Sequence, residues 1–81
     1  MSAAYVLMNI RDMNGINDVH NLHQSLHAVP GVKSVHLLTG PTDVITYVEA
    51  KDETSLMETI GKLRGIKGIS NTDTRIVMPM Q

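Results

Sequence analysis

Four residues in the middle of the chain, Gly40-Pro41-Thr42-Asp43, combine a flexible backbone with two polar side chains. Gly40 can adopt a positive φ, while Pro41 lacks a backbone donor and stiffens the segment. The Thr42 hydroxyl, the Asp43 carboxylate and free backbone amides could together hold an α-amino acid, with its ammonium group on Asp43. The alternative is that these residues simply complete an Asx-type turn between two strands. The residue types alone favour the turn.

Histidines supply the second group of chemically versatile side chains. His20, His23 and His27 recur at i, i+3 and i+7, which predicts one column along a helix. Three imidazoles in a column could ligate zinc or another divalent ion. The column has no obvious fourth ligand, although Asp18 is close in sequence, and His36 belongs to a separate segment. The alternative is a half-exposed helix flank or a subunit contact that titrates near neutral pH. We therefore assign no metal site and no cofactor.

A catalytic constellation is hard to assemble from this sequence. It contains no cysteine, no G-x-S-x-G elbow, no G-x-x-x-x-G-K-[ST] loop and no G-x-G-x-x-G signature. The glycines of "GKLRGIKG" close a helix rather than open one, which argues against a phosphate cradle. We therefore predict that the protein is not an enzyme. The alternative is a small dimeric ferredoxin-like enzyme in which Tyr47 or His36 acts in a pocket.

Composition excludes several other classes of protein. The chain has 81 residues, enough for one domain, and its formal net charge is -1. Direct binding of nucleic acid normally requires a basic surface, and stacking on bases requires more aromatic residues than two tyrosines. The apolar runs are too short to span a membrane, and the N-terminus lacks the features of a signal peptide. We expect a cytoplasmic protein that contacts neither nucleic acid nor membrane directly.

Short apolar segments and two amphipathic ones alternate along the chain. The apolar segments predict strands, which cover Ala4–Ile10, Val32–Thr39, Asp43–Ala50 and Thr72–Met78. The amphipathic segments predict helices, of which the first runs from Ile16 to Val29 and the second from Asp52 to Gly65 or Gly68. Asn17 or Asp18 is expected to cap the first helix, and Asp52 the second.

This order of elements predicts a ferredoxin-like βαββαβ fold. An internal repeat supports it, because a shift of 37 residues aligns Leu26 with Leu63 and Gly31 with Gly68. Two such halves form a four-stranded antiparallel sheet with two helices on one face. The short connection between the second and third strands predicts an antiparallel hairpin.

The predicted strands are apolar on both faces. Val6, Met8 and Ile10 point to one side of the first strand, and Tyr5 and Leu7 to the other. A sheet with one solvated face should instead alternate apolar and polar residues. Two helices can cover only one face, so we predict a homodimer or a larger assembly that covers the other. The alternative is a monomer with scattered exposed apolar residues.

Three short motifs in fixed order carry a resemblance to a known family. They are a P-G-V before the second strand (Pro30-Gly31-Val32), a G-x-x-D hairpin (Gly40 to Asp43), and a G-[VI] followed by T-x-T (Gly68-Ile69 and Thr72-Asp73-Thr74). With this spacing, the segment Val29–Met78 resembles the effector-binding RAM domain of the Lrp/AsnC transcriptional regulators. An aromatic residue is frequent in the family's hairpin where this chain has Thr42.

The resemblance implies a function and a site. Family members dimerise through their sheets, often assemble further to octamers, and bind amino acids between dimers near the hairpin and the T-x-T strand. Carried over by position, the ligand-binding residues would be Gly40, Thr42, Asp43, Thr72 and Thr74. Because no helix-turn-helix precedes the first strand, we expect residues 1–81 to form one stand-alone RAM-type domain without a DNA-binding domain. It would sense an amino acid in the regulation of amino-acid metabolism, or co-assemble with full-length Lrp/AsnC regulators. Alternatives are an ACT-like regulatory domain and a purely structural oligomerisation unit.

Overall fold

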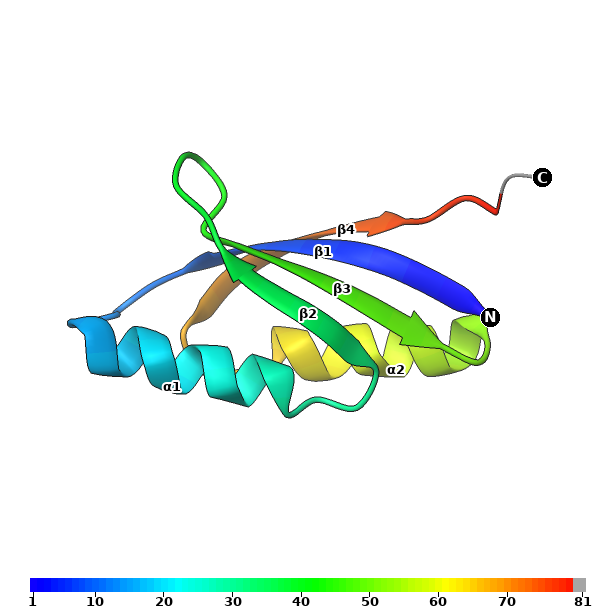
Figure 1. The fold of residues 1–81 in the computed structure, drawn as a ribbon, viewed down its shortest axis with the longest axis horizontal. Helices are drawn as coiled ribbons and strands as arrows, with labels where there is room; N and C mark the ends of the chain where they lie inside the picture. The colour runs from blue at the N-terminus through cyan, green and yellow to red at the C-terminus, as the bar shows by residue number, and fades with distance from the viewer. Residues whose placement is uncertain (80–81) are drawn as a thin grey trace.

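Two βαβ halves build the protein, as the computed structural model shows for residues 1–79 (Figure 1). The elements in chain order are β1 (Ser2–Ile10), α1 (Ile16–His27), β2 (Val32–Leu37), β3 (Val44–Ala50), α2 (Glu53–Arg64) and β4 (Ile69–Ile76). The strand order is β2-β3-β1-β4, and every neighbouring pair is antiparallel. Both helices lie on the same face of the sheet (Figure 1). The predicted ferredoxin-like fold is confirmed.

The core lies between the helices and the sheet. Ala4, Val6 and Met8 of β1 alternate with outward-facing neighbours and are fully buried, as are Val44 and Val48 of β3. These strand side chains point to one face because successive strand residues project to opposite sides. The helices contribute a matching stripe of apolar residues, which comprises Leu22, Leu26, Leu56, Ile60 and Leu63.

The two helices begin in different ways. The predicted cap of α1 is wrong, because the helix begins at Ile16 behind Gly15, whose φ is 97° and which makes no side-chain cap. Asp18 lies within the first turn, where its Oδ2 accepts a hydrogen bond from Asn14 N at 3.0 Å. The predicted cap of α2 is confirmed, since Asp52 Oδ1 accepts from Ser55 N at 2.8 Å. This backbone hydrogen bond lowers the pKa of Asp52.

Strand β4 begins three residues earlier than the sequence predicted. Gly68 has a φ of 101° and turns the chain out of α2, so that Ile69 at once pairs with Ile10 and is buried against the core. The regular pairing ends at Ile76, after which only Val77 N continues to Ala3 O at 2.9 Å. Ile69, an apolar residue directly after the glycine that turns the chain, was therefore a better indicator of where the strand starts than Thr72.

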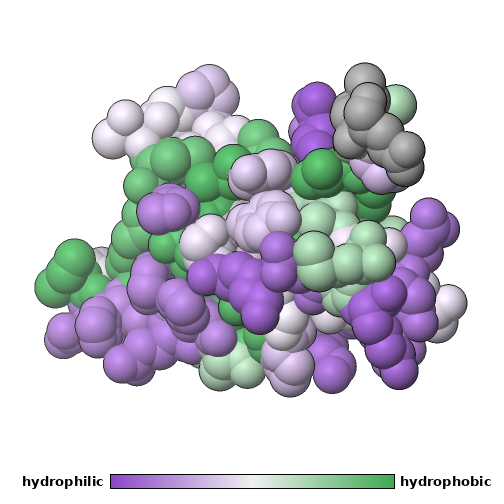
Figure 2. Space-filling view, turned by 45° about the vertical axis from the view of Figure 1, so that its right-hand side comes forward, coloured by the Kyte–Doolittle hydropathy of each residue, from purple (hydrophilic) through white to green (hydrophobic). Residues whose placement is uncertain are grey.

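The sheet face away from the helices carries apolar and aromatic side chains. Tyr5 and Tyr47 lie opposite each other on β1 and β3, with ring centroids 5.0 Å apart. Leu7 and Ile45 form the next pair on this face of the two strands. Figure 2 shows apolar surface gathered in the upper part of the molecule, beside the projecting hairpin, while hydrophilic residues cover the lower part. The predicted second apolar face is present.

Neither helix in residues 1–79 is long and apolar enough to cross a membrane.

Neighbouring residues of α2 provide a test of the core. Leu56 is fully buried, whereas Met57 is 52% exposed. Leu56→Ala should lower the free energy of unfolding by about 2–5 kcal/mol, because it removes buried apolar surface and leaves a cavity. Met57→Ala should change it by roughly 0.5 kcal/mol or less. Urea denaturation measures both values, and equal effects would contradict this assignment of the core face.

Candidate functional site

The hairpin between β2 and β3 projects from the sheet and is fastened at its base by Asp43 (Figure 1). Asp43 Oδ2 accepts a hydrogen bond from Ile10 N at 2.9 Å. Its backbone N donates to Met8 O at 3.1 Å, and its carbonyl oxygen accepts from Leu38 N at 2.8 Å. One oxygen of the carboxylate therefore holds the hairpin to the end of β1. The other oxygen, Oδ1, has no hydrogen bond to residues 1–79.

Asn9 is the second anchor of the hairpin. Its side-chain Nδ2 donates to Pro41 O at 2.7 Å and to Asp43 Oδ2 at 3.3 Å. On its other side, Asn9 O accepts from Ser70 Oγ at 3.2 Å, and Ser70 also donates to Asn71 Oδ1. These bonds connect the hairpin through β1 to the beginning of β4. The sequence analysis missed Asn9, although a polar residue near the end of an apolar strand was a usable signal.

Gly40 and Thr42 lie in the projecting part of the hairpin. Gly40 has a φ of 104°, and a Cβ built at this position would meet no atom within 4 Å. Glycine is therefore required here for its backbone conformation rather than for space. Thr42 is half-buried, and no hydrogen bond joins its hydroxyl to the described part of the chain. Both residues leave polar backbone or side-chain groups at the tip of the hairpin.

The two threonines of β4 lie on the helix-covered face. Thr72 pairs with Met8 and Thr74 with Val6, and both partners point into the core. Thr72 Oγ1 accepts a hydrogen bond from Arg64 Nε at 3.2 Å. Thr74 Oγ1 is buried and has no hydrogen-bond partner in residues 1–79. Buried hydroxyls normally have a partner, so Thr74 is an exception that a bound group could satisfy.

Strand order separates the predicted site residues into two groups within one chain. Asp43 lies at the start of β3, Thr72 lies on β4, and β1 runs between these strands. Two strand spacings of about 4.8 Å place the two groups roughly 10 Å apart across the sheet. The hairpin group is therefore Gly40, Thr42 and Asp43, and the β4 group is Thr72 and Thr74.

Arg64 extends the β4 group. It borders a small cavity of about 240 Å³, which is also lined by Ile69, Ser70, Asn71 and Thr72. Among the described residues, the guanidinium forms no salt bridge. A planar guanidinium beside hydroxyl and amide groups suits a carboxylate, which it can bind through two parallel hydrogen bonds. The proximity of Arg64 to β4 is a tertiary feature.

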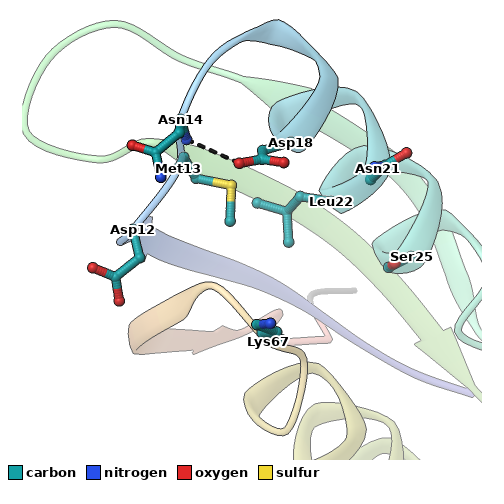
Figure 3. A pocket seen from close by; sticks show the side chains of 8 residues that line it. All are labelled: Asp12, Met13, Asn14, Asp18, Asn21, Leu22, Ser25 and Lys67. Atoms are coloured by element: carbon teal, nitrogen blue, oxygen red, sulfur yellow. Dashed lines mark hydrogen bonds between the residues drawn. The ribbon is translucent and has the colours of Figure 1, made fainter.

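A larger groove of about 510 Å³ lies between α1 and the segment after α2. Figure 3 shows Lys67 on one side of this groove, with Asp12 and Asp18 around the other. The Asp18 carboxylate accepts a hydrogen bond there from the backbone N of Asn14. The groove contains none of the ligand-binding residues predicted from the sequence.

The alternative catalytic residues lie on the open face of the sheet. Tyr47 and His36 border a shallow cavity of about 250 Å³ with Tyr5, Ser34 and other neighbours. Tyr47 Oη donates to Glu49 Oε2 at 3.0 Å, and this hydrogen bond raises the pKa of Tyr47. A phenol held in its protonated form by a carboxylate is a poor general base. Of the two alternative catalytic residues at this cavity, the hydrogen bond to Glu49 disfavours Tyr47 alone.

The histidine column does not gather three ligands. His23 and His27 approach each other, with ring centroids 5.5 Å apart, whereas His20 is not part of this contact. Within residues 1–79, no three His, Cys, Asp or Glu side chains come together in a way that could hold a metal ion.

Comparison with known proteins establishes the family. Residues 4–80 match the family described as the Lrp/AsnC ligand binding domain. The match covers nearly the whole sequence, so this chain belongs to that family. The resemblance inferred from the hairpin and T-x-T motifs is thereby confirmed. The family is a ligand-binding regulatory domain of transcriptional regulators.

Two kinds of curated protein contain a related segment. A homocitrate synthase from Sulfurisphaera tokodaii is 42% identical over 53 residues, which cover 65% of this chain and 12% of the enzyme. The HTH-type transcriptional regulator LysM from Saccharolobus solfataricus is 30% identical over 57 residues, which cover 70% of this chain and 40% of the regulator. The chain thus corresponds to a minor part of each of these proteins.

Solved structures share the complete fold. The protein named FFRP-DM1 is 28% identical, has a TM-score of 0.83, and the similarity covers 96% of this chain and 100% of that one. A transcriptional regulator from Neisseria meningitidis, crystallised as an L-Met complex, is 20% identical with a TM-score of 0.81. That similarity covers 96% of this chain and 50% of the regulator, and shows a common fold.

Removal of the Asn9 amide tests the anchor of the hairpin. Asn9→Ala deletes the donor to Pro41 O and Asp43 Oδ2. We expect faster amide hydrogen exchange around the hairpin and a loss of about 1 kcal/mol in unfolding free energy, the usual net value of such bonds. Asn21→Ala, on the exposed side of α1, is the matched control. Unchanged exchange of the Ile10 and Asp43 amides in Asn9→Ala would contradict the anchoring role.

Proposed function

We propose that this chain binds an α-amino acid as an effector and acts as a regulatory module in amino-acid metabolism. The observation that carries the proposal is the match of residues 4–80 to a ligand-binding domain family. The hairpin supports it, because its anchored base holds polar groups at a projecting tip.

In the proposed complex, the hairpin group receives the ligand's ammonium. Asp43 already uses Oδ2 to hold Ile10 N, and its free Oδ1 is the acceptor that we assign to the ammonium. Gly40 and Thr42, farther out on the hairpin, supply backbone amides and a hydroxyl. In this arrangement the Asp43 carboxylate can hold Ile10 N and the ligand's ammonium at the same time, since an ionised carboxylate accepts several hydrogen bonds.

The ligand's carboxylate is assigned to the β4 group of a neighbouring chain. Arg64 and Thr72 border a cavity of about 240 Å³ there, and the unpaired hydroxyl of Thr74 lies on the same strand. The roughly 10 Å between the two groups within one chain, which follows from two strand spacings, supports a ligand site completed by a second molecule.

We further propose that two chains associate through the open sheet face and that these dimers assemble further, to an octamer. Tyr5 remains 44% exposed on this face, although it stacks on Tyr47. Contiguous exposed apolar surface beside polar surroundings is typical of association sites. A second copy fits because its face is equally apolar, and a twofold axis pairs the same patch on both subunits.

Regulation of transcription is the role that we assign to the module, with residues 1–81 as one RAM-type domain. A net charge of -1 argues against direct contact of these residues with DNA. The module would act in the cytoplasm, through co-assembly with full-length Lrp/AsnC regulators.

Control of an enzyme is the second candidate role. The specific observation in its favour is the match to one segment of a homocitrate synthase, which at 42% identity exceeds the 30% identity to LysM. In this case the effector site would be the same, and the module's partner would be an enzyme. Co-purification with each class of partner, with and without effector, separates the two roles.

An amino-acid melting screen tests the effector site. Each of the twenty L-amino acids is added in excess, beginning with L-Met, and thermal unfolding is followed by circular dichroism. A true effector at about 100 times its Kd should add roughly 2.7 kcal/mol to the free energy of unfolding. Asp43→Asn should abolish the shift, because it removes the charge for the ammonium but keeps an oxygen acceptor for Ile10 N. No shift with any amino acid would contradict the proposal, and a shift that survives in Asp43→Asn would contradict this site.

A charge on the open sheet face tests the dimer. Leu7 lies on this face, opposite Ile45 and two residues along β1 from Tyr5. Leu7→Arg should convert the assembly into monomers, since an unpaired charge would be buried in the interface. Lys51→Arg, at an exposed position beyond β3, is the control. Sedimentation velocity measures the outcome, and a wild-type monomer would refute association through this face.

A further inference from the structure

Two histidines of α1 lie side by side at the C-terminal end of the helix. His23 and His27 are four residues apart, and such pairs are neighbours on a helix surface. Their ring centroids are 5.5 Å apart and their planes are inclined by 46°. Two imidazoles that share one zinc ion, with Zn–N bonds of about 2.1 Å, place their ring centroids roughly 5 Å apart. The observed pair is therefore within a small side-chain rotation of a chelating arrangement.

We propose that His23 and His27 form a two-ligand site for a divalent transition-metal ion. Imidazole nitrogen is a ligand of intermediate softness that suits Cu²⁺, Ni²⁺ and Zn²⁺, whereas Mg²⁺ and Ca²⁺ prefer oxygen. Within the first-row series, Cu²⁺ is expected to bind most tightly. This site is independent of the proposed effector site, because α1 carries none of the residues assigned to that site.

The position of the pair on the helix favours a cation. Helix α1 ends at His27, so an ion held by the two rings lies at the negative end of the helix dipole. The helix sequence INDVHNLHQSLH contains no lysine or arginine that would repel the ion. The next basic residue along the chain is Lys33, in β2.

The site is peripheral to the core and incomplete in its ligands. Leu22 and Leu26 are the buried residues of α1, while His27 is exposed and His23 half-buried on the flank. No third metal-ligating side chain joins the pair among residues 1–79. The remaining coordination positions therefore go to water or to a second chain. Such a site binds reversibly and is not required for folding, in contrast to a closed structural zinc site.

Titration of the full chain, produced without a histidine tag, tests the proposal. Isothermal titration with CuCl₂, NiCl₂ and ZnCl₂ should show saturable binding, with Cu²⁺ the tightest. His23→Gln and His27→Gln should each weaken binding by roughly 10²-fold, because each removes one of two linked ligands. His20→Gln is the matched control on the same helix and should bind as the unmodified chain does. Both histidines of the pair lie outside the core, so circular dichroism should show folded variants.

Paramagnetic broadening locates the ion independently of affinity. Substoichiometric Ni²⁺ or Cu²⁺ should selectively broaden the ring signals of His23 and His27 in NMR spectra. Absence of saturable binding would overturn the proposal. So would binding that persists undiminished in the His23→Gln/His27→Gln double variant, or a loss in His20→Gln as large as that in His27→Gln.

Discussion

Burial of one apolar sheet face beneath two helices is the interaction on which the rest of the structure depends. Val6, Met8 and Val48 point into this layer and are fully buried. The strand period of two then necessarily turns Tyr5 and Tyr47 to the opposite side, because alternate residues face opposite ways. The sheet thus presents aromatic and aliphatic side chains on a face that no element of residues 1–79 covers. The strand alternation that points one set of side chains into the core therefore also places apolar side chains on the second face.

The hairpin depends on this sheet for its position. Its base is fastened to β1 by the Asp43 carboxylate and by the Asn9 amide, while Asn9 O also accepts a bond from Ser70 at the start of β4. Three strands that are far apart in sequence thereby meet in one polar network at one end of the sheet. Under the proposed function, a ligand on the free oxygen of Asp43 would act on a group that already holds the hairpin. Such a group could link effector binding to the position of the hairpin.

Much of the fold could be predicted from the sequence because its signals are local. Short apolar runs identified β1 and β3, Pro30-Gly31 marked the end of the first helical segment, and Asp52 was correctly predicted to cap α2. The errors also have local causes. Asp18 looked like an N-cap, yet α1 already begins at Ile16 because Gly15 can adopt a φ of 97°. The start of β4 was placed too late, at Thr72, although Ile69 already pairs with Ile10.

The sequence by itself determined the order of elements, the doubly apolar sheet, the hairpin with Asp43 at its base and the resemblance to the family. These properties follow from residue types at short spacing, where steric and hydrophobic preferences act directly. Only the tertiary structure decided that Asn9 anchors the hairpin, that Arg64 meets Thr72, and that Thr72 and Thr74 lie apart from Asp43. These relations depend on which strands are neighbours, and the insertion of β1 between β3 and β4 is set by the packing of the whole sheet against its helices.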